Sequence, residues 1–233
     1  MPLPRSADVL IIGGGHAGLC AAITAAEAGA QVLLLERAPR LMRGGNTRHT
    51  RNLRAMHNTP VAGLEGTYDN DEYWQDLLRV TEGNTNQTLA QLMINSSQSL
   101  LAWLQDHEVH FQPSLSGTLS LSRTNAFFLG GGCALLNALY LRAERCGVHI
   151  AYDSDVCDFN LEQNVIRTVI VKQNSTEHLI EANAVVVSCG GFQANADWMR
   201  KAWGPAADNF LIRGTPYNEG HVLAALMDKG IAT

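Results

Sequence analysis

One segment near the start of the chain constrains the fold more than any other. Residues 8–37 read DVLIIGGGHAGLCAAITAAEAGAQVLLLER. The apolar run 9–12 is typical of a strand, and the small residues of 19–28 predict a helix. A second apolar run, 32–35, ends on the acid Glu36. The segment therefore predicts a strand–helix–strand unit of the kind that builds parallel sheets.

Between the first strand and the helix, Gly13, Gly15 and Gly18 satisfy the pattern G-x-G-x-x-G. The first glycine allows a tight turn, the second lets the backbone approach a pyrophosphate, and the third lets helix and strand pack closely. The N–H groups and the dipole of the helix start face the phosphates. Glu36 has the separation from which an acid accepts hydrogen bonds from a ribose diol, and an acid there disfavours a 2′-phosphate. Together these features predict a dinucleotide site.

Composition places the chain among ordinary globular proteins, with 233 residues, 46% of them hydrophobic and 17% charged. The net charge of −5 comes without a basic block, which argues against nucleic acid as a partner. No apolar run approaches the ~20 residues of a membrane span, and we expect no signal peptide. The cysteines lack C-x-x-C spacing, so we expect free thiols in a reducing cytoplasm; they are Cys20, Cys133, Cys146, Cys157 and Cys189.

Beyond Glu36 the character of the sequence changes. Residues 39–70 are polar with no clear period, and we expect a loop there, either ordered over a site or mobile. Apolar residues at helical spacing then predict helices over 71–82 and 88–106, and a third over 135–146 after three glycines.

From residue 148 onward, apolar and polar residues alternate, which predicts short strands. Asn174-Ser175 forms a turn, and a last apolar run, 184–188, ends in Cys-Gly-Gly. Such a meander suits FAD domains of the two-dinucleotide-binding-fold type, in which it covers the parallel sheet. We therefore predict an α/β, Rossmann-like FAD-binding domain with a parallel sheet and a β-meander. The predicted meander strands are 148–152, 156–161, 165–172 and 177–180.

A second glycine motif follows the predicted ribose-binding acid. Arg43, Gly44, Gly45, Asn46 and Thr47 give a backbone that can press against a flat ring, with N–H, amide and hydroxyl groups for phosphate or flavin edges. The alternative is a plain surface turn, because G-G-N is common in loops. Its position directly after Glu36 favours contact with FAD.

A dense set of cations lies immediately beyond this motif. One interpretation is recognition of a polycarboxylate, because arginine pairs with a carboxylate through two parallel charge-assisted hydrogen bonds. The alternative is that several of these side chains are solvated or pair with acids elsewhere in the fold. The set comprises Arg48, His49, Arg51, Arg54 and His57.

Other polar features are given more modest roles. His16 and Ala17, inside the first turn, are interpreted as helix-start residues that contact the cofactor, with no role for His16 as a base. Cys189 and Gly190 end a strand, where FAD domains let the backbone approach the nucleotide, and the Cys189 thiol is interpreted as packing. Glycines 130–132 either cradle an anion at a helix start or form a loop-to-helix turn.

Five stretches of the chain carry a family likeness. They are DVLIIGGGHAGLCAA, LLLERAP, RGGNTRHTRNLR, SLSGTLSLSRTNAFFLGGG and VVVSCGGF. The chain resembles the flavoproteins of the fumarate reductase/succinate dehydrogenase family, and within it the FAD-dependent tricarballylate dehydrogenase (CobZ-like) branch. The first and last stretches are shared by the wide family, whereas RHTRNLR and SRTNAFFLGGG are narrower.

This resemblance implies an FAD-dependent dehydrogenase of CH–CH groups that converts tricarballylate to cis-aconitate, with hydride transfer to flavin N5 and a proton to a base. It implies electron transfer to a membrane-associated iron–sulfur or haem partner, and hence a cytoplasmic protein held peripherally at the inner membrane. The residues that it assigns to FAD are Gly13, Gly15, Gly18, Glu36, Arg37, Gly44, Gly45, Asn46 and Thr47, with Val156 near the adenine and Gly190 through the backbone.

The chain departs from this branch in two ways. Cys133 stands where the branch has a lysine after the glycines, which leaves the substrate open. Such flavoproteins are also nearly twice as long, so residues 1–233 are expected to be an N-terminal FAD-binding domain without its cap domain and C-terminal flavin-binding segment. No catalytic base is nominated. The alternatives are another fumarate reductase-like, ketosteroid dehydrogenase-like or cobalamin-synthesis flavoprotein, and a non-catalytic remnant.

Overall fold

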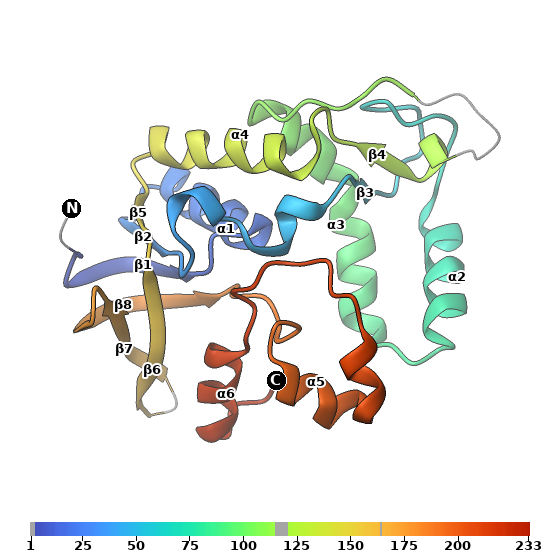
Figure 1. The fold of residues 1–233 in the computed structure, drawn as a ribbon. Helices are drawn as coiled ribbons and strands as arrows, with labels where there is room; N and C mark the ends of the chain where they lie inside the picture. Colours follow the sequence, from blue (N-terminus) through green and yellow to red (C-terminus); the bar gives the residue numbers. More distant parts are fainter. Residues whose placement is uncertain (1–2, 115–120, 164) are drawn as a thin grey trace. The chain divides into compact units, whose positions relative to one another are not determined.

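The computed structural model describes residues 3–114, 121–163 and 165–233 (Figure 1). The chain forms two compact units. We call residues 1–49 with 139–233 the sheet unit, and residues 50–138 the helical unit. The assignment of all 233 residues to one FAD-binding domain stays a prediction.

The predicted strand–helix–strand unit forms as expected at the centre of the sheet unit. Strand β1 (Ser6–Ile12) leads into helix α1 (His16–Glu27) and then into β2 (Val32–Leu35). β1 pairs in parallel with β2 and with β8 (Thr176–Val187), and β2 pairs in parallel with β5 (His149–Ala151). The sheet order is β5-β2-β1-β8-β7-β6, so the parallel strands occupy one side of it.

The meander continues the same sheet through a long last strand. β6 (Ser154–Glu162) and β7 (Val165–Gln173) pair antiparallel, and β7 pairs antiparallel with the first half of β8. The prediction of two separate runs, 177–180 and 184–188, was wrong, because β8 is one continuous strand. Its polar residues Glu181 and Asn183 resemble a break in the sequence, yet both are exposed around buried Ala182, so the period of two persists.

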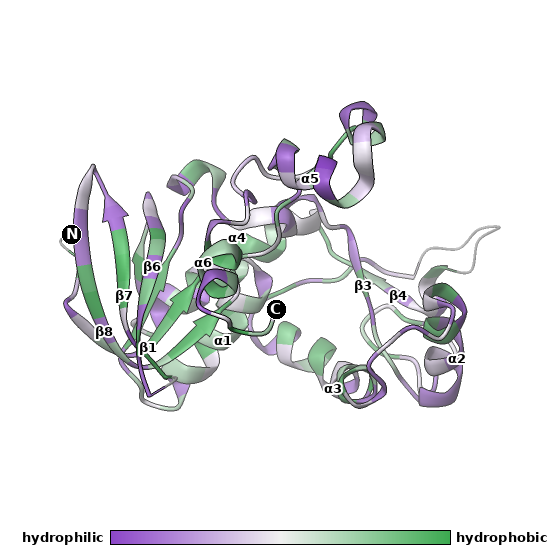
Figure 2. Cartoon of the chain, turned by 90° about the horizontal axis from the view of Figure 1, so that it is seen from below, coloured by the Kyte–Doolittle hydropathy of each residue, from purple (hydrophilic) through white to green (hydrophobic). Residues whose placement is uncertain are grey.

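The parallel strands and the meander share one hydrophobic core. Leu10 and Ile12 of β1 share a core with Phe159 of β6 and Val169 of β7, and α6 (His221–Asp228) adds Val222. Figure 2 shows the hydrophobic residues running along β1 and β7. Helix α1 packs on β1 and β2, and its Leu19 and Ile23 side chains are fully buried. The fold class predicted from the sequence, an α/β FAD-binding domain with a mostly parallel sheet, is confirmed.

The stretch 39–70 holds more regular structure than the sequence predicted. It contains the 3₁₀ helices η1 (Arg40–Met42) and η2 (Gly45–His49) and the short strand β3 (Asn52–Arg54). Elements this short leave no detectable period, which is why the pattern gave only a loop. The sheet unit is completed by α5 (Ala196–Trp203) and η4 (Gly204–Asn209).

The helical unit contains both predicted amphipathic helices within one residue of their expected bounds. Asp69 caps α2 (Asn70–Thr81) by accepting from the Glu72 N–H, and Asn86 caps α3 (Gln87–Asp106) by accepting from the Leu89 N–H. β3 pairs antiparallel with β4 (Asn125–Phe127), preceded by η3 (Leu121–Arg123). Part of the family-like stretch 114–132 lies outside the described residues.

Helix α4 (Gly131–Arg145) begins four residues earlier than the predicted 135, inside the glycine run, and extends from the helical unit into the sheet unit. The Gly131 N–H donates to the Phe128 carbonyl and the Gly132 N–H donates to the Thr50 carbonyl. These bonds satisfy donors that a helix start leaves open, so glycine can begin the helix here. They favour the loop-to-helix turn over the anion cradle.

The β7–β8 hairpin turn generates a stability prediction. Asn174 and Ser175 have φ of 48° and 63°, a left-handed pair that suits asparagine followed by glycine. Replacing Ser175 by glycine should raise the unfolding free energy by roughly 0.5–1 kcal/mol, because serine resists this conformation. Urea denaturation measures it, with Thr168→Gly inside β7 as a control that should destabilise. A less stable Ser175→Gly variant would contradict the turn geometry.

Candidate nucleotide-binding site

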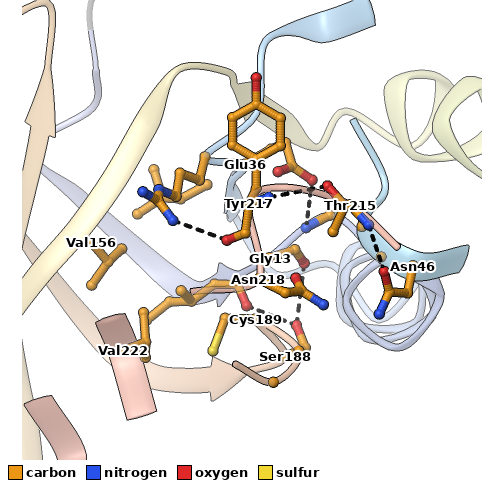
Figure 3. Close-up of a pocket in the computed structure, with 18 of the residues that line it drawn as sticks. Gly13, Glu36, Asn46, Val156, Ser188, Cys189, Thr215, Tyr217, Asn218 and Val222 are labelled. Atoms are coloured by element: carbon orange, nitrogen blue, oxygen red, sulfur yellow. Dashed lines mark hydrogen bonds between the residues drawn. The ribbon is translucent and has the colours of Figure 1, made fainter. Parts of the chain in front are cut away.

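A cavity of about 280 Å³ opens in the sheet unit where β1, β2 and β8 end and α1 begins (Figure 3). Ligands of open α/β sheets bind at the carboxyl ends of the strands, so the cavity lies where the fold is expected to bind one. The predicted residues that line it are Gly13, Gly15, His16, Ala17, Glu36, Arg37, Gly45, Asn46, Thr47, Val156, Cys189 and Gly190.

The three motif glycines have different surroundings. Gly13 has φ of 102°, and a Cβ there would lie 2.5 Å from the Ser188 carbonyl oxygen. A Cβ at Gly18 would lie 1.9 Å from the Gly13 carbonyl oxygen, so only glycine lets α1 approach the turn. At Gly15 the nearest atom to a Cβ would be Thr47 Oγ1 at 3.5 Å. Gly15 therefore keeps space open in front of its backbone.

The start of α1 presents N–H groups to this space. In the described part of the chain, no hydrogen bond reaches the N–H groups of Gly15 and Ala17, whereas the His16 N–H donates to Thr47 Oγ1 at 3.0 Å. The first turn of α1 contains no acidic residue. Open N–H groups at the positive end of a helix dipole form a site for an anion such as a diphosphate.

Glu36 connects the two glycine motifs. Its side chain is 6% exposed, and Oε2 accepts from the N–H groups of Gly14 (3.2 Å) and Gly44 (3.1 Å). Oε1 accepts from the Ala38 N–H at 2.9 Å. A carboxylate has about four acceptor positions, so at least one is left for a ribose hydroxyl. The acid thus has a structural role beside its predicted one.

The second glycine motif forms the wall facing the turn. Thr47 contacts the start of α1, and Asn46 Oδ1 accepts from the Thr215 N–H at 2.8 Å. Across the cavity the Asn218 side chain packs on Gly190, where an added Cβ would meet Asn218 Nδ2 at 2.9 Å. The motif therefore belongs to a packed wall and is more than an exposed turn.

Arg37 closes one end of the cavity within a charged cluster. Its Nη1 donates to the Tyr217 carbonyl at 2.9 Å, Nε lies 3.3 Å from Asp155, and Nη2 pairs with Glu219. This guanidinium lowers the pKa of Glu219. His221 lies between the same two acids, 3.5 Å from Asp155 and 3.6 Å from Glu219. The cluster fixes residues 217–221 against β2 and β6.

Two titratable groups in the cavity are shifted toward their neutral forms. Burial lowers the pKa of His16 and raises the pKa of the Cys189 thiol, because desolvation disfavours each charged form. A thiol with a raised pKa is a poor nucleophile, which agrees with a packing role for Cys189.

Three residues predicted to bind the cofactor lie outside the lining: Gly18, Arg43 and Gly44. Gly18 acts through packing and Gly44 through its N–H bond to Glu36. Arg43 donates to the Tyr152 hydroxyl at 2.9 Å and stacks on Tyr140. Direct contact of these three with the cofactor stays a prediction.

The predicted cations are divided between the two units. Arg48 donates to the carbonyls of Leu41 (2.6 Å) and Arg43, so it shapes its own loop, while His49 is exposed. In the helical unit, Arg54 lies 3.5 Å from Asp76 and 3.2 Å from the Tyr68 hydroxyl.

Arg51 differs from Arg54. Both side chains are exposed, but among the described residues that of Arg51 forms no ion pair or hydrogen bond. His57 is buried against the Ala55 carbonyl.

The sequence analysis missed the wall contributed by the last third of the chain. Within this wall, the local sequence feature that could have indicated a special backbone position is Gly220, a left-handed residue directly before α6. The missed residues are Ser154, Asp155, Gln193, Thr215, Tyr217, Asn218, Gly220, His221 and Val222.

Comparison with known proteins identifies the class. A family described as "FAD binding domain" matches residues 8–232, and the chain belongs to this family of fumarate reductase/succinate dehydrogenase flavoproteins. The NADH:fumarate oxidoreductase of Klebsiella pneumoniae is 27% identical over 99% of this chain and 25% of its own length.

Two solved structures share the fold. An open flavocytochrome c3 fumarate reductase has a TM-score of 0.84 at 20% identity, over 96% of this chain and 40% of that one. The 3-ketosteroid-Δ4-(5α)-dehydrogenase of Rhodococcus jostii has a TM-score of 0.83 at 22% identity, over 97% of this chain and 54% of that one. The chain thus spans between a quarter and about half of the length of these proteins.

FAD is the cofactor of this class, and the residues present fit it. The open N–H groups of Gly15 and Ala17 suit the diphosphate, Glu36 keeps an acceptor for the ribose, and Val156 and Val222 offer an apolar surface. None of the helices in the described part of the chain combines the length and apolar character needed to cross a membrane.

The glycine geometry predicts that one alanine variant loses FAD affinity and another loses thermal stability. Gly15→Ala meets only ordinary contacts, so it should leave the melting temperature unchanged yet weaken FAD binding at least about tenfold, because its methyl group enters the space for the diphosphate. Gly18→Ala should lower the melting temperature through its clash with Gly13. Thermal denaturation of the apoprotein and FAD titration distinguish them. Equal loss of stability in both variants would refute the assignment.

Burial of His16 predicts a pH dependence. The unfolded chain binds a proton at this residue near its ordinary pKa of 6.5, whereas the folded chain binds it only at lower pH. The unfolded state therefore holds more protons in this window, and the unfolding free energy falls as the pH falls below about 6.5. His16→Gln should lose less stability than the wild type between about pH 7.5 and 5.5, measured by urea denaturation. Identical pH dependence in the two proteins would contradict the shift.

Proposed function

We propose that this chain forms the FAD-binding part of an oxidoreductase that acts on the CH–CH bond of a small polycarboxylate, with oxidation of tricarballylate to cis-aconitate as the specific reaction. Bound FAD supplies a two-electron acceptor. The residues of this chain hold its adenosine diphosphate, and we nominate no base among them for the substrate proton.

The exposed cation Arg51 carries the polycarboxylate part of the proposal. It follows the cavity residue Thr47 by four positions in the sequence. Guanidinium groups bind carboxylates in a bidentate manner, and His49 adds a second exposed donor nearby in the sequence. Arg54 is expected to contribute less because Asp76 already lies beside it.

The second candidate is reduction of a carbon–carbon double bond, which the Klebsiella NADH:fumarate oxidoreductase favours. Under either reaction direction, we propose that electrons pass to or from a membrane-associated iron–sulfur or haem protein. The likeness to a flavocytochrome supports a haem partner. Such a partner would hold a cytoplasmic protein at the inner membrane.

Anaerobic flavin spectroscopy of the purified protein tests the proposal. Tricarballylate should bleach the absorption of the oxidised flavin, and the amount of cis-aconitate formed should equal the amount of flavin reduced. If tricarballylate does not bleach the flavin and fumarate reoxidises the reduced flavin, the result would support the reductase instead. A folded protein that binds FAD but responds to neither compound would support the non-catalytic alternative.

The two arginines of the segment should behave differently on substitution. Arg51→Ala should raise the apparent KM for the polycarboxylate about tenfold or more with unchanged FAD content, because it removes charge-assisted hydrogen bonds. Arg54→Ala should instead destabilise the fold by about 1 kcal/mol, because it removes the contacts with Asp76 and Tyr68. Arg79→Ala also removes a partner of Asp76 and is the matched control for the loss of stability in Arg54→Ala. An unchanged KM in Arg51→Ala would reject the carboxylate site.

A further inference from the structure

Tyr140 of α4 contacts both elements that define the nucleotide site, although no sequence motif selects it. Its side chain is fully buried in the sheet unit. The hydroxyl donates to the Gly14 carbonyl at 2.9 Å and lies 3.5 Å from Glu36 Oε2. A Cβ added at Gly14 would lie 2.0 Å from this hydroxyl. The hydroxyl therefore lies directly against the glycine turn.

Both backbone polar groups of Gly14, the N–H and the carbonyl, form hydrogen bonds. Its N–H donates to Glu36 Oε2, and its carbonyl accepts from Tyr140. The preceding carbonyl, that of Gly13, accepts from the Ser188 hydroxyl at 3.2 Å. Because the Gly14 carbonyl and the Gly15 N–H belong to the same planar peptide group, fixing the carbonyl fixes the direction of that N–H.

The Tyr140 ring is itself held in place. The Arg43 guanidinium lies 4.1 Å from the ring centroid and donates to the Tyr152 hydroxyl at 2.9 Å. This stacking is a cation–π contact, which explains why Arg43 belongs to the glycine motif without lining the cavity.

We infer that Tyr140 is a positioning residue for FAD: its hydroxyl orients the Gly14–Gly15 peptide group so that the Gly15 N–H faces the diphosphate. Tyr140 acts through Gly14 and Glu36 and does not line the cavity. The inference depends on cofactor binding alone and goes beyond the proposed substrate and reaction.

The first test compares two tyrosine-to-phenylalanine variants of the full chain. Tyr140→Phe keeps the ring and loses the hydroxyl, so the Kd for FAD should rise about 5- to 10-fold, and the Kd for ADP should rise by a similar factor. Tyr68→Phe loses a hydroxyl on an equally buried ring that contacts Asp76 and Arg54 but neither Gly14 nor Glu36, and its Kd should stay within about twofold of wild type. An unchanged Kd in Tyr140→Phe, or an equal rise in both variants, would overturn the inference.

The second test uses a suppressor that a general loss of stability would not produce. Gly14→Ala should weaken FAD binding more than Tyr140→Phe does, because its Cβ displaces the Tyr140 hydroxyl and the Glu36 carboxylate, which would lie 2.0 and 2.8 Å away. Adding Tyr140→Phe removes the nearer clash and should restore FAD binding by at least about fivefold over Gly14→Ala. A double variant that binds no better than Gly14→Ala would contradict the inference, and so would one in which binding merely follows the melting temperature.

Discussion

A buried carboxylate organises the nucleotide site of this protein. Burying an ionised group is costly unless hydrogen bonds compensate it, and Glu36 receives N–H groups from Gly14, Ala38 and Gly44. Two of these donors belong to separate glycine motifs, so one charge joins the turn after β1 to the loop after β2. Charge-assisted bonds of this kind are stronger than neutral ones, and those to Gly14 and Gly44 fix residues that have no side chain of their own. Packing of the glycines alone would not set the direction of their N–H groups.

The consequence for the candidate site is a backbone whose open N–H groups suit a diphosphate. The carboxylate takes the Gly14 N–H, whereas the N–H groups of Gly15 and Ala17, at the positive end of α1, are open to an anion because a helix start leaves them without a partner in the helix. This part of the molecule supports FAD binding regardless of the substrate. In the proposed function, substrate choice belongs to the segment beyond Thr47, where Arg48 and Arg54 have structural partners and Arg51 forms no ion pair among the described residues.

Local patterns were sufficient for much of this architecture. The strand–helix–strand unit, the two capped helices of the helical unit and the meander follow from periods and turn residues that the sequence displays directly. The continuity of β8 was missed because polar Glu181 and Asn183 interrupt its run of apolar residues, although the strand pairing continues through them. Tyr140 and the wall of residues 215–222 were missed because their contacts join positions more than a hundred residues apart, which no local pattern encodes.

A crystal structure of the protein with bound FAD tests the central claim most directly. The account predicts diphosphate oxygens within hydrogen-bond distance of the Gly15 and Ala17 N–H groups, while Glu36 keeps its bonds to Gly14 and Gly44. A diphosphate bound away from the start of α1, or a Glu36 carboxylate that has left both glycines to bind the ribose alone, would contradict it.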